Sequence, residues 1–152
     1  MKNETSKGST FYPEAKRSYQ KLFLTHMNKG AKALNLRNTH FANAHGLMNE
    51  KSHSTADDVA LLTCYAMKNE TFRLIVKKKE FGCEVLNRTY SQNRKLTWPN
   101  TNKLLNIDGF IGVKTGVTPT AGPCLSSMFR INEKESIIIV VLKVKSLEYR
   151  FK

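Results

Sequence analysis

The chain has 152 residues, of which 40% are apolar, and this composition suits one domain with a single core. It excludes a fibre and a disordered chain. The chain has 25 lysine and arginine residues and only 12 acidic ones, so its net charge is +13. This charge leaves three kinds of anionic partner open: nucleic acid, an acidic lipid surface and an anionic wall polymer.

The first half of the sequence has the apolar periodicity of helices. Residues 11–34 carry apolar side chains at helical spacing and predict one long helix, with Gly30 as its weak point. Residues 35–51 are rich in turn formers and predict a loop that lies over a helix surface. A capping-box-like start at residues 54–57 predicts a helix that runs to about Met67, and a short helix is expected over residues 71–79.

The last third of the sequence has the composition of β-strands. After a polar and partly extended segment, residues 82–106, three apolar runs follow at residues 110–117, 124–131 and 137–144, separated by turn signals. Helices first and strands last predict an α+β fold, with helices packed on one face of an antiparallel sheet. We assign residues 1–152 to a single domain, in which residues 11–80 are mainly helical and residues 107–145 form a three-stranded antiparallel meander.

The cysteines and histidines predict neither a metal site nor a cofactor. The three cysteines are Cys64, Cys83 and Cys124, whose odd number and wide spacing favour neither a disulfide framework nor a metal site. His40, His45 and His53 share one loop, but no carboxylate or thiolate stands beside them at ligand spacing, so capping and packing roles are expected. The polar N-terminus lacks the apolar segment of a signal peptide, and no run approaches the ~20 apolar residues of a membrane helix. The sequence as written indicates a soluble chain that is not exported.

The most informative motif is Lys114-Thr115-Gly116, on the first predicted strand. A lysine ammonium at this position supplies a positive field for a substrate carboxylate, and the threonine hydroxyl can donate a hydrogen bond to it. Glycine lacks the Cβ that would keep a peptide from lying along the strand edge as an added strand. The triplet alone is also typical of a solvated lysine before a glycine bulge, so the surrounding motifs have to show whether it marks a binding site.

Several short motifs accompany the triplet. They are Thr39-x-Phe41-x-Asn43-x-His45-Gly46-Leu47, His53-Ser54-Thr55-Ala56-x-Asp58, Asn87-Arg88, Trp98-x-Asn100-Thr101-Asn102-x-Leu104-Leu105, Thr118-x-x-Ala121-Gly122-x-Cys124-Leu125 and Ser146-x-x-x-Arg150-Phe151. In this order and spacing, they resemble the D-alanyl-D-alanine carboxypeptidases, the low-molecular-weight penicillin-binding proteins of serine peptidase family S11, over about residues 22–152. The resemblance implies a fold like that of β-lactamases and transpeptidases, here incomplete at the N-terminus.

The resemblance implies substrate-binding roles for five residues. Lys114 and Thr115 would bind the carboxylate of a terminal D-alanine, and Gly116 would allow its close approach. The backbone N–H of Val117 would be one donor of the oxyanion hole. Arg150 stands where the family often has an arginine near the carboxylate pocket, and a surface or interface role is equally open for it. The ligands implied are peptides that end in D-alanine, or β-lactams.

The sequence departs from the family in the motifs of the nucleophile and the general base. The family's Ser-x-Asn falls where Glu4-Thr5-Ser6 stands, and too little sequence precedes it for the family's Ser-x-x-Lys. One literal Ser-x-x-Lys, Ser18 to Lys21, is expected by chance in so lysine-rich a chain. We therefore predict no catalytic residue and no acyl-enzyme hydrolysis by this chain alone. Poor solubility or dependence on a partner is also expected, because the sheet edge and the core face that the family covers would be exposed.

Three interpretations of function remain open. The leading one is a partial S11 carboxypeptidase, whose full-length form would cleave the terminal D-alanine of peptidoglycan stem peptides through an acyl-enzyme. The second is a catalytically dead binding remnant, which Glu4-Thr5-Ser6 favours. The third, a basic nucleic-acid-binding domain, rests on charge alone, and we expect no specific nucleic acid partner because no binding motif is present. Family members are usually exported and membrane-associated, so an anionic wall or membrane surface is a further expected partner.

Overall fold

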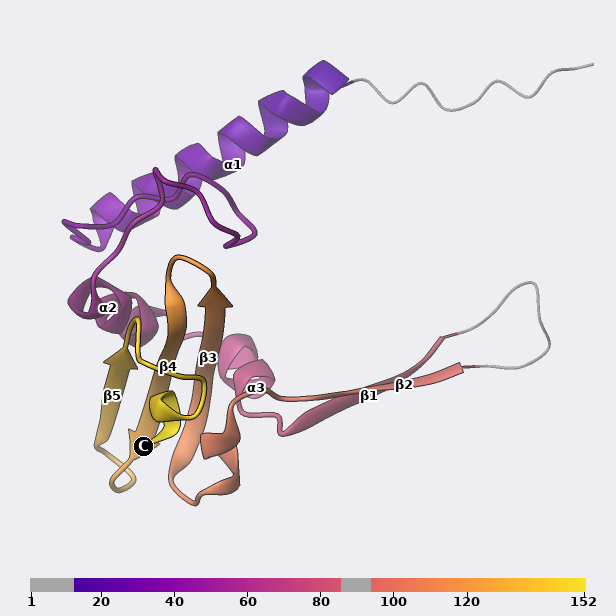
Figure 1. Cartoon of the computed structure of the whole chain (residues 1–152), viewed down its shortest axis with the longest axis vertical. Helices are drawn as coiled ribbons and strands as arrows, with labels where there is room; N and C mark the ends of the chain where they lie inside the picture. Colours follow the sequence, from indigo (N-terminus) through magenta and orange to yellow (C-terminus); the bar gives the residue numbers. More distant parts are fainter. Residues whose placement is uncertain (1–12, 86–93) are drawn as a thin grey trace, which may run out of the picture.

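The protein has an α+β fold, as predicted (Figure 1). The structure is a computed structural model that describes residues 13–85 and 94–152. Its helices are α1 (Pro13–Ala33), α2 (Ala56–Ala66), α3 (Glu70–Val76) and the short 3-10 helices η1 (Lys103–Asn106) and η2 (Tyr149–Phe151). Its strands are β1 (Glu80–Val85), β2 (Arg94–Pro99), β3 (Phe110–Thr118), β4 (Gly122–Arg130) and β5 (Ser136–Val141).

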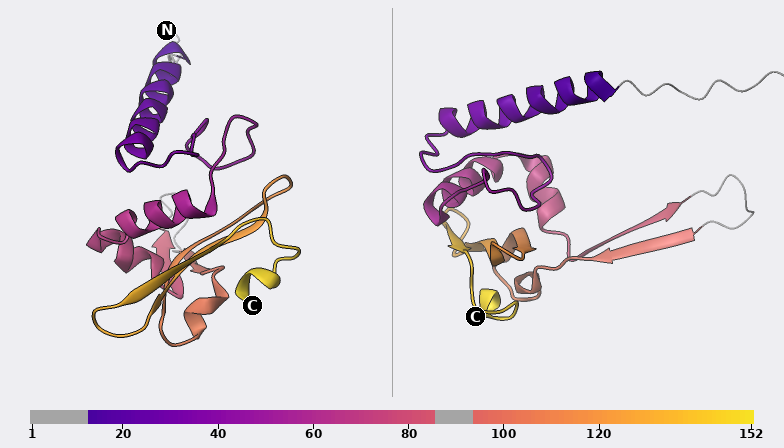
Figure 2. Two further views of the ribbon diagram at one scale, coloured as in Figure 1. Left: turned by 90° about the vertical axis from the view of Figure 1, so that its left-hand side faces the viewer. Right: turned by 45° about the horizontal axis from the view of Figure 1, so that its top comes forward.

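The predicted meander is present as a three-stranded antiparallel sheet in the order β3-β4-β5. β4 is its central strand and contains the buried run Leu125 to Ser127, with Thr115 opposite Leu125 on β3. Helices α2 and α3 pack on one face of the sheet, and η2 lies on the other (Figure 2). The third strand ends at Val141, three residues earlier than expected, because Lys143 takes a left-handed φ of 53° that an extended strand does not allow.

The start of α2 differs by one residue from the prediction. Thr55, rather than Ser54, is the N-cap, and its side chain accepts a hydrogen bond from the backbone N–H of Asp58 at 3.2 Å. The buried Asp58 carboxylate accepts from the backbone of Asn38 at 2.8 Å and from the Thr39 hydroxyl at 2.7 Å. The carboxylate therefore ties the loop after α1 to the first turn of α2.

The segment predicted as polar and partly extended contains a separate two-stranded antiparallel sheet, β1–β2, followed by η1, which the sequence did not indicate. The β1–β2 sheet projects from the three-stranded sheet (Figure 1). Its register places Phe81 opposite Trp98 and Cys83 opposite Leu96. Because successive side chains alternate between faces, these four side chains share one face, which is apolar.

The apolar core of the described residues is small. The buried apolar side chains are Ala31, Leu36, Met67, Leu104, Leu105, Val113 and Leu125. Large aromatic side chains are exposed instead, among them Tyr19 (71%), Phe23 (56%), Phe81 (51%) and Trp98 (50%). Within the described ranges, no helix is both long and apolar enough to span a membrane. Large apolar side chains are therefore exposed on several elements, including α1 and the β1–β2 sheet.

Candidate functional site

The Lys114-Thr115-Gly116 triplet lies in the middle of β3, at an edge of the three-stranded sheet. β4 pairs with one side of β3, and no other strand among the described residues pairs with the opposite side. An edge strand presents backbone N–H and C=O groups that an extended peptide can use to add itself to the sheet. The position of the triplet therefore suits binding of an extended peptide.

The three side-chain positions of the triplet have different surroundings. The Lys114 side chain is exposed, and its amine donates a hydrogen bond to the backbone carbonyl of Thr115. Thr115 is 8% exposed, and its hydroxyl lies 2.6 Å from that of Thr101. A Cβ added at Gly116 would meet no heavy atom within 4 Å, so the space beside this residue is open. The site thus combines an exposed cation, a buried hydroxyl and an exposed glycine with open space beside it.

Val117 follows the triplet and is 59% exposed. Its partner in the register of β3 and β4 is Pro123, which has no backbone N–H. Pro123 therefore donates no ladder hydrogen bond to Val117. In an antiparallel pair, residues outside the hydrogen-bonded pairs direct their N–H and C=O groups away from the partner strand. The lack of an N–H at Pro123 is consistent with a Val117 backbone whose N–H and C=O groups point away from β4.

Arg150 reaches the triplet from η2, which follows β5. Its Nη1 donates to the carbonyl of Gly116 at 3.3 Å, and its guanidinium lies 4.9 Å from the centre of the Phe151 ring. Its Nε is buried and has no hydrogen-bond partner among the described residues. The structure thus brings Arg150 beside the triplet although 34 positions separate it from Gly116.

The turn before η1 holds β3 in place, and sequence reasoning did not assign it this role. Asn100 donates from its backbone N–H to the carbonyl of Lys79 at 2.7 Å and from its side chain to that of Lys78 at 2.9 Å. Asn102, 3% exposed, donates from its side chain to the carbonyl of Gly112 at 2.8 Å. The turn therefore bridges the segment after α3 and the first part of β3.

Trp98 precedes this turn and belongs to β2. Trp98 is half exposed, and its ring stacks on that of Phe81 with 6.1 Å between the ring centres. The asparagine spacing in Asn100-x-Asn102 was the signal that could have identified the anchors, because short amide side chains commonly bond to nearby backbone groups in turns.

Serine hydroxyls near the triplet are buried in the sheet. Ser126 lies 2.8 Å from the hydroxyl of Thr63, and Ser127 is 1% exposed. Within residues 19–85 and 94–152, no hydroxyl or thiol is hydrogen-bonded to the amine of Lys114. Ser18 is on α1, but its side chain is outside the described part. Glu4-Thr5-Ser6 and Asn87-Arg88 also lie outside the described residues.

The three histidines of the loop after α1 have local partners. His40 and His53 form an isolated β-bridge, with their ring centres 6.0 Å apart. Nδ1 of His45 accepts from the backbone of Leu47 at 3.1 Å. In the part of the chain that the structure describes, no three histidine, cysteine or acidic side chains come together in a metal-binding arrangement. These contacts shape the loop.

The known proteins whose sequences match this chain point to one family. The sequence profile of the peptidase S11 family, described as D-alanyl-D-alanine carboxypeptidase, matches residues 17–146. The D-alanyl-D-alanine carboxypeptidase of Streptomyces sp. (strain K15) is 42% identical over 106 residues, which are 69% of this chain and 36% of that protein. The carboxypeptidase DacF of Bacillus subtilis is 34% identical over 119 residues, covering 78% of this chain and 29% of that one.

Solved structures agree with the sequence comparison. The DD-transpeptidase of Streptomyces K15 superimposes with a TM-score of 0.77 at 39% identity, covering 84% of this chain and 49% of that chain. The carboxypeptidase DacD of Francisella tularensis gives a TM-score of 0.73 at 28% identity, covering 84% and 41%. The chain thus spans about a third of the length of the two curated relatives and about half of the solved chains. Since the family profile covers most of its residues, the chain belongs to peptidase family S11, the D-alanyl-D-alanine carboxypeptidases.

Proposed function

We propose that this chain provides the substrate-binding strand of a serine-type D-alanyl-D-alanine carboxypeptidase that acts on peptidoglycan stem peptides. The observation that carries the proposal is that Lys114 and Thr115 directly precede Gly116, whose carbonyl accepts from Arg150 and beside which the space is open. Two cations and a hydroxyl donor suit a carboxylate, because hydrogen bonds to ionised groups are about twice as strong as neutral ones. A peptide that ends in D-alanine presents this carboxylate, as does a β-lactam of the penicillin type.

The proposed role of β3 is to orient the peptide before the chemical step. Lys114 and Thr115 bind the terminal carboxylate, and Arg150 adds positive charge from η2. With the carboxylate fixed, the carbonyl that is to be attacked lies near the exposed backbone of Val117. The N–H of Val117 then stabilises the negative oxygen of the tetrahedral intermediate, a kind of contribution that is typically worth about 3 kcal/mol.

The nucleophile and its base have to come from the part of an S11 domain that this chain does not span. Acyl-enzyme chemistry needs a serine within hydrogen-bond reach of a lysine or other base. Without that pair, an oxyanion hole and a carboxylate site retain only weak catalysis. We therefore propose that the described residues bind substrate and that covalent catalysis requires the rest of the domain, on this polypeptide or on another.

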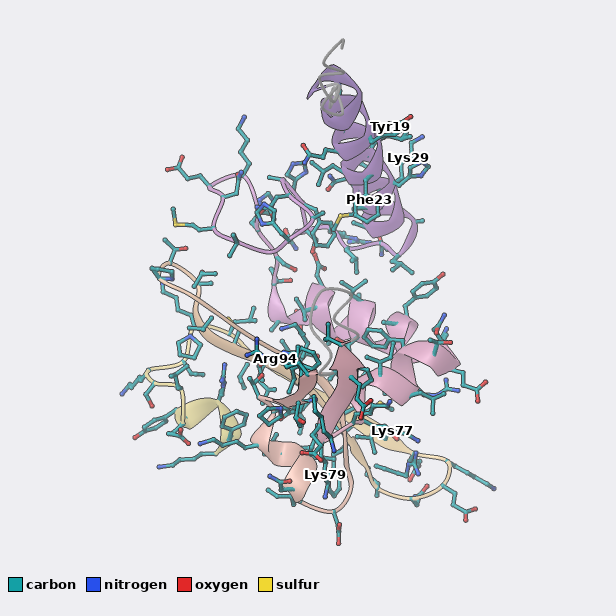
Figure 3. All side chains as sticks on the ribbon, turned by 90° about the vertical axis from the view of Figure 1, so that its right-hand side faces the viewer. Tyr19, Phe23, Lys29, Lys77, Lys79 and Arg94 are labelled. Atoms are coloured by element: carbon teal, nitrogen blue, oxygen red, sulfur yellow. The ribbon has the colours of Figure 1, made fainter. Side chains whose placement is uncertain are left out.

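Two exposed apolar surfaces support this requirement. The aromatic face of α1 carries Tyr19 and Phe23, and the apolar face of the β1–β2 sheet carries Phe81 and Trp98. Figure 3, viewed from the side to which the β1–β2 sheet projects, shows Tyr19 and Phe23 above Arg94 of β2. A two-stranded sheet is marginally stable alone and needs a packing partner. The rest of an S11 domain would cover both surfaces.

The carboxylate site is tested by peptide binding. Fluorescence anisotropy of a labelled peptide ending in D-alanyl-D-alanine should report binding that is lost when the terminal carboxylate is converted to an amide. Lys114→Ala should weaken binding at least tenfold, whereas Lys134→Ala, which removes the same charge at the turn between β4 and β5, should change it less than twofold. Equal binding of the peptide and its amide would contradict the proposal.

Covalent labelling separates the enzyme from a binding remnant of the same family. We expect no labelling of this chain by a fluorescent penicillin, and labelling once the segment of the Streptomyces K15 enzyme that precedes the matched region is added. If this chain is more soluble together with the added segment than alone, the result would support the proposed packing of the exposed surfaces. If the mixture binds the peptide but is never labelled, the chain is a carboxylate-binding remnant, the alternative that Glu4-Thr5-Ser6 favours.

The positive charge supports a weaker, less specific association with an anionic wall polymer or membrane surface. Among the described residues, Lys103 and Glu148 form one ion pair, at 2.9 Å. Lys77 and Lys79, after α3, and Arg94 on β2 face the same side of the molecule as the β1–β2 sheet (Figure 3). Such binding should fall steeply as salt rises. Retention on DNA that does not depend on salt would dismiss the nucleic-acid interpretation.

A further inference from the structure

We propose that Thr101 is a positioning residue for the carboxylate site: its hydroxyl donates a hydrogen bond to Oγ1 of Thr115 and leaves the Thr115 proton for the ligand. The two oxygens lie 2.6 Å apart, so a hydrogen bond joins them in one of its two directions. The inference rests on the proposed function for the ligand. The arrangement of the two threonines is a property of the free protein and can be measured without a ligand.

The direction of this hydrogen bond follows from the number of protons that the pair holds. A threonine hydroxyl has one proton to donate and two lone pairs that accept. If Thr115 donated to Thr101, a carboxylate at the site would meet only the lone pairs of Thr115, which repel it. If Thr101 donates, Thr115 keeps its proton for the carboxylate. The ligand therefore selects the direction in which Thr101 is the donor.

The burial of the two residues allows the same direction once the carboxylate is bound. Thr115 is 8% exposed, and the hydroxyl of Thr101 is its partner in the free protein. Thr101 is exposed, and water can donate to its lone pairs when its own proton is engaged. When the carboxylate accepts the Thr115 proton, Thr101 as donor therefore leaves neither hydroxyl unsatisfied, which matters because an unpaired polar group at a buried position is costly.

Thr101 can act as a fixed donor because both of its neighbours in sequence are anchored. Asn100 is bonded to the carbonyls of Lys78 and Lys79, between α3 and β1, at 2.9 and 2.7 Å. Asn102 is bonded to the carbonyl of Gly112 on β3 at 2.8 Å. The backbone of Thr101 thus lies between hydrogen bonds to the segment that joins α3 to β1 and a hydrogen bond to β3, the strand that carries Thr115. The turn sets the distance between the two hydroxyls.

The test begins with the side-chain rotamer of Thr115 in the free 152-residue chain. Three-bond couplings from the threonine methyl carbon to the backbone nitrogen and carbonyl carbon report χ1 by NMR. We expect a single Thr115 rotamer in the unmodified chain and in Thr101→Ser, which keeps the hydroxyl. We expect averaged rotamers in Thr101→Val, which keeps the shape but removes the donor. A single unchanged rotamer in Thr101→Val would overturn the inference whatever the binding results.

Binding measurements then distinguish positioning from a merely structural contact. Thr101→Val should weaken binding of a peptide ending in D-alanyl-D-alanine by about three- to tenfold, the range expected for one hydrogen bond. Thr101→Ser should restore binding to within twofold. In a Thr115→Val background, Thr101→Val should have no further effect, because the two residues act through one contact. An additive loss in the double variant would overturn the inference.

The C-terminal amide of the same peptide separates this inference from the proposed function. If the unmodified chain binds peptide and amide equally, the carboxylate site itself is wrong, and the role of Thr101 toward a ligand is overturned with it. If the chain discriminates between them and Thr101→Val retains the full discrimination, the carboxylate site stands and only the role of Thr101 is overturned. Loss of discrimination in Thr101→Val, with rescue by Thr101→Ser, supports both.

Discussion

The substitution Asn102→Ala tests whether the turn before η1 holds β3, the strand that carries the candidate site. The Asn102 side chain is 3% exposed and makes two hydrogen bonds. It donates to the carbonyl of Gly112 at 2.8 Å and accepts from the backbone of Leu104 at 3.2 Å. Both partners are buried. Alanine removes both bonds and leaves a buried carbonyl and a buried N–H unpaired.

The expected cost follows from these two unpaired groups. A buried donor or acceptor that loses its partner costs about 1–3 kcal/mol, so two of them with partial relaxation give about 2–4 kcal/mol. One factor of ten in an equilibrium constant is about 1.4 kcal/mol, and local opening of β3 should therefore become about 30-fold or more easier. Asn106→Ala is the matched control, because Asn106 is exposed in η1, the 3-10 helix that Asn102 caps, and a surface substitution costs less than about 0.5 kcal/mol.

Hydrogen exchange of the backbone amides of residues 110–118 measures this opening directly and does not require cooperative unfolding of the whole chain. Asn102→Ala should accelerate exchange in β3 by the factor above, and Asn106→Ala should leave it nearly unchanged. Acceleration below about fivefold, or equal acceleration in both variants, would show that the turn does not hold the strand. The account of how the triplet is positioned would then be refuted.

Three further substitutions test other parts of the fold, each by hydrogen exchange. Asp58→Ala removes the acceptor of two hydrogen bonds from the loop after α1 and should destabilise the start of α2 by about 2–4 kcal/mol. Thr55→Ala removes the N-cap of α2 and should cost about 0.5–2 kcal/mol, confined to its first turn. Lys103→Ala breaks an ion pair with Glu148 whose side chains are 62% and 64% exposed, and it should cost less than about 1 kcal/mol.

The elements that the sequence predicted well are those whose apolar pattern matches their environment. The runs that became β3, β4 and β5 are apolar because the sheet is covered by α2 and α3 on one face, and turn residues mark their ends. The helix from Ala56 was predictable because a capping residue precedes an apolar periodicity. In each case the local sequence and the tertiary contacts favour the same structure.

The β1–β2 sheet was not predictable in the same way. One face of this sheet, with Phe81, Cys83, Leu96 and Trp98, is apolar. These four residues lie on two short strands that are separated from each other in the sequence. The alternation in each strand covers only a few residues, too few for a pattern to stand out among the surrounding polar residues. The role of Asn102 was hidden for a related reason, since a single buried amide leaves no periodic signal.

The candidate site joins a part that local sequence defines and a part that only the fold creates. Lys114, Thr115 and Gly116 are adjacent, so their chemistry could be inferred from the triplet and its edge strand. Arg150 and Thr101 contribute because η2 and the turn before η1 are folded back onto β3. The motifs therefore indicated the groups that would meet the carboxylate, Arg150 included, but not Thr101, whose role depends on how the turn before η1 is folded. A variant that leaves the triplet intact and moves either of these two elements should impair carboxylate binding.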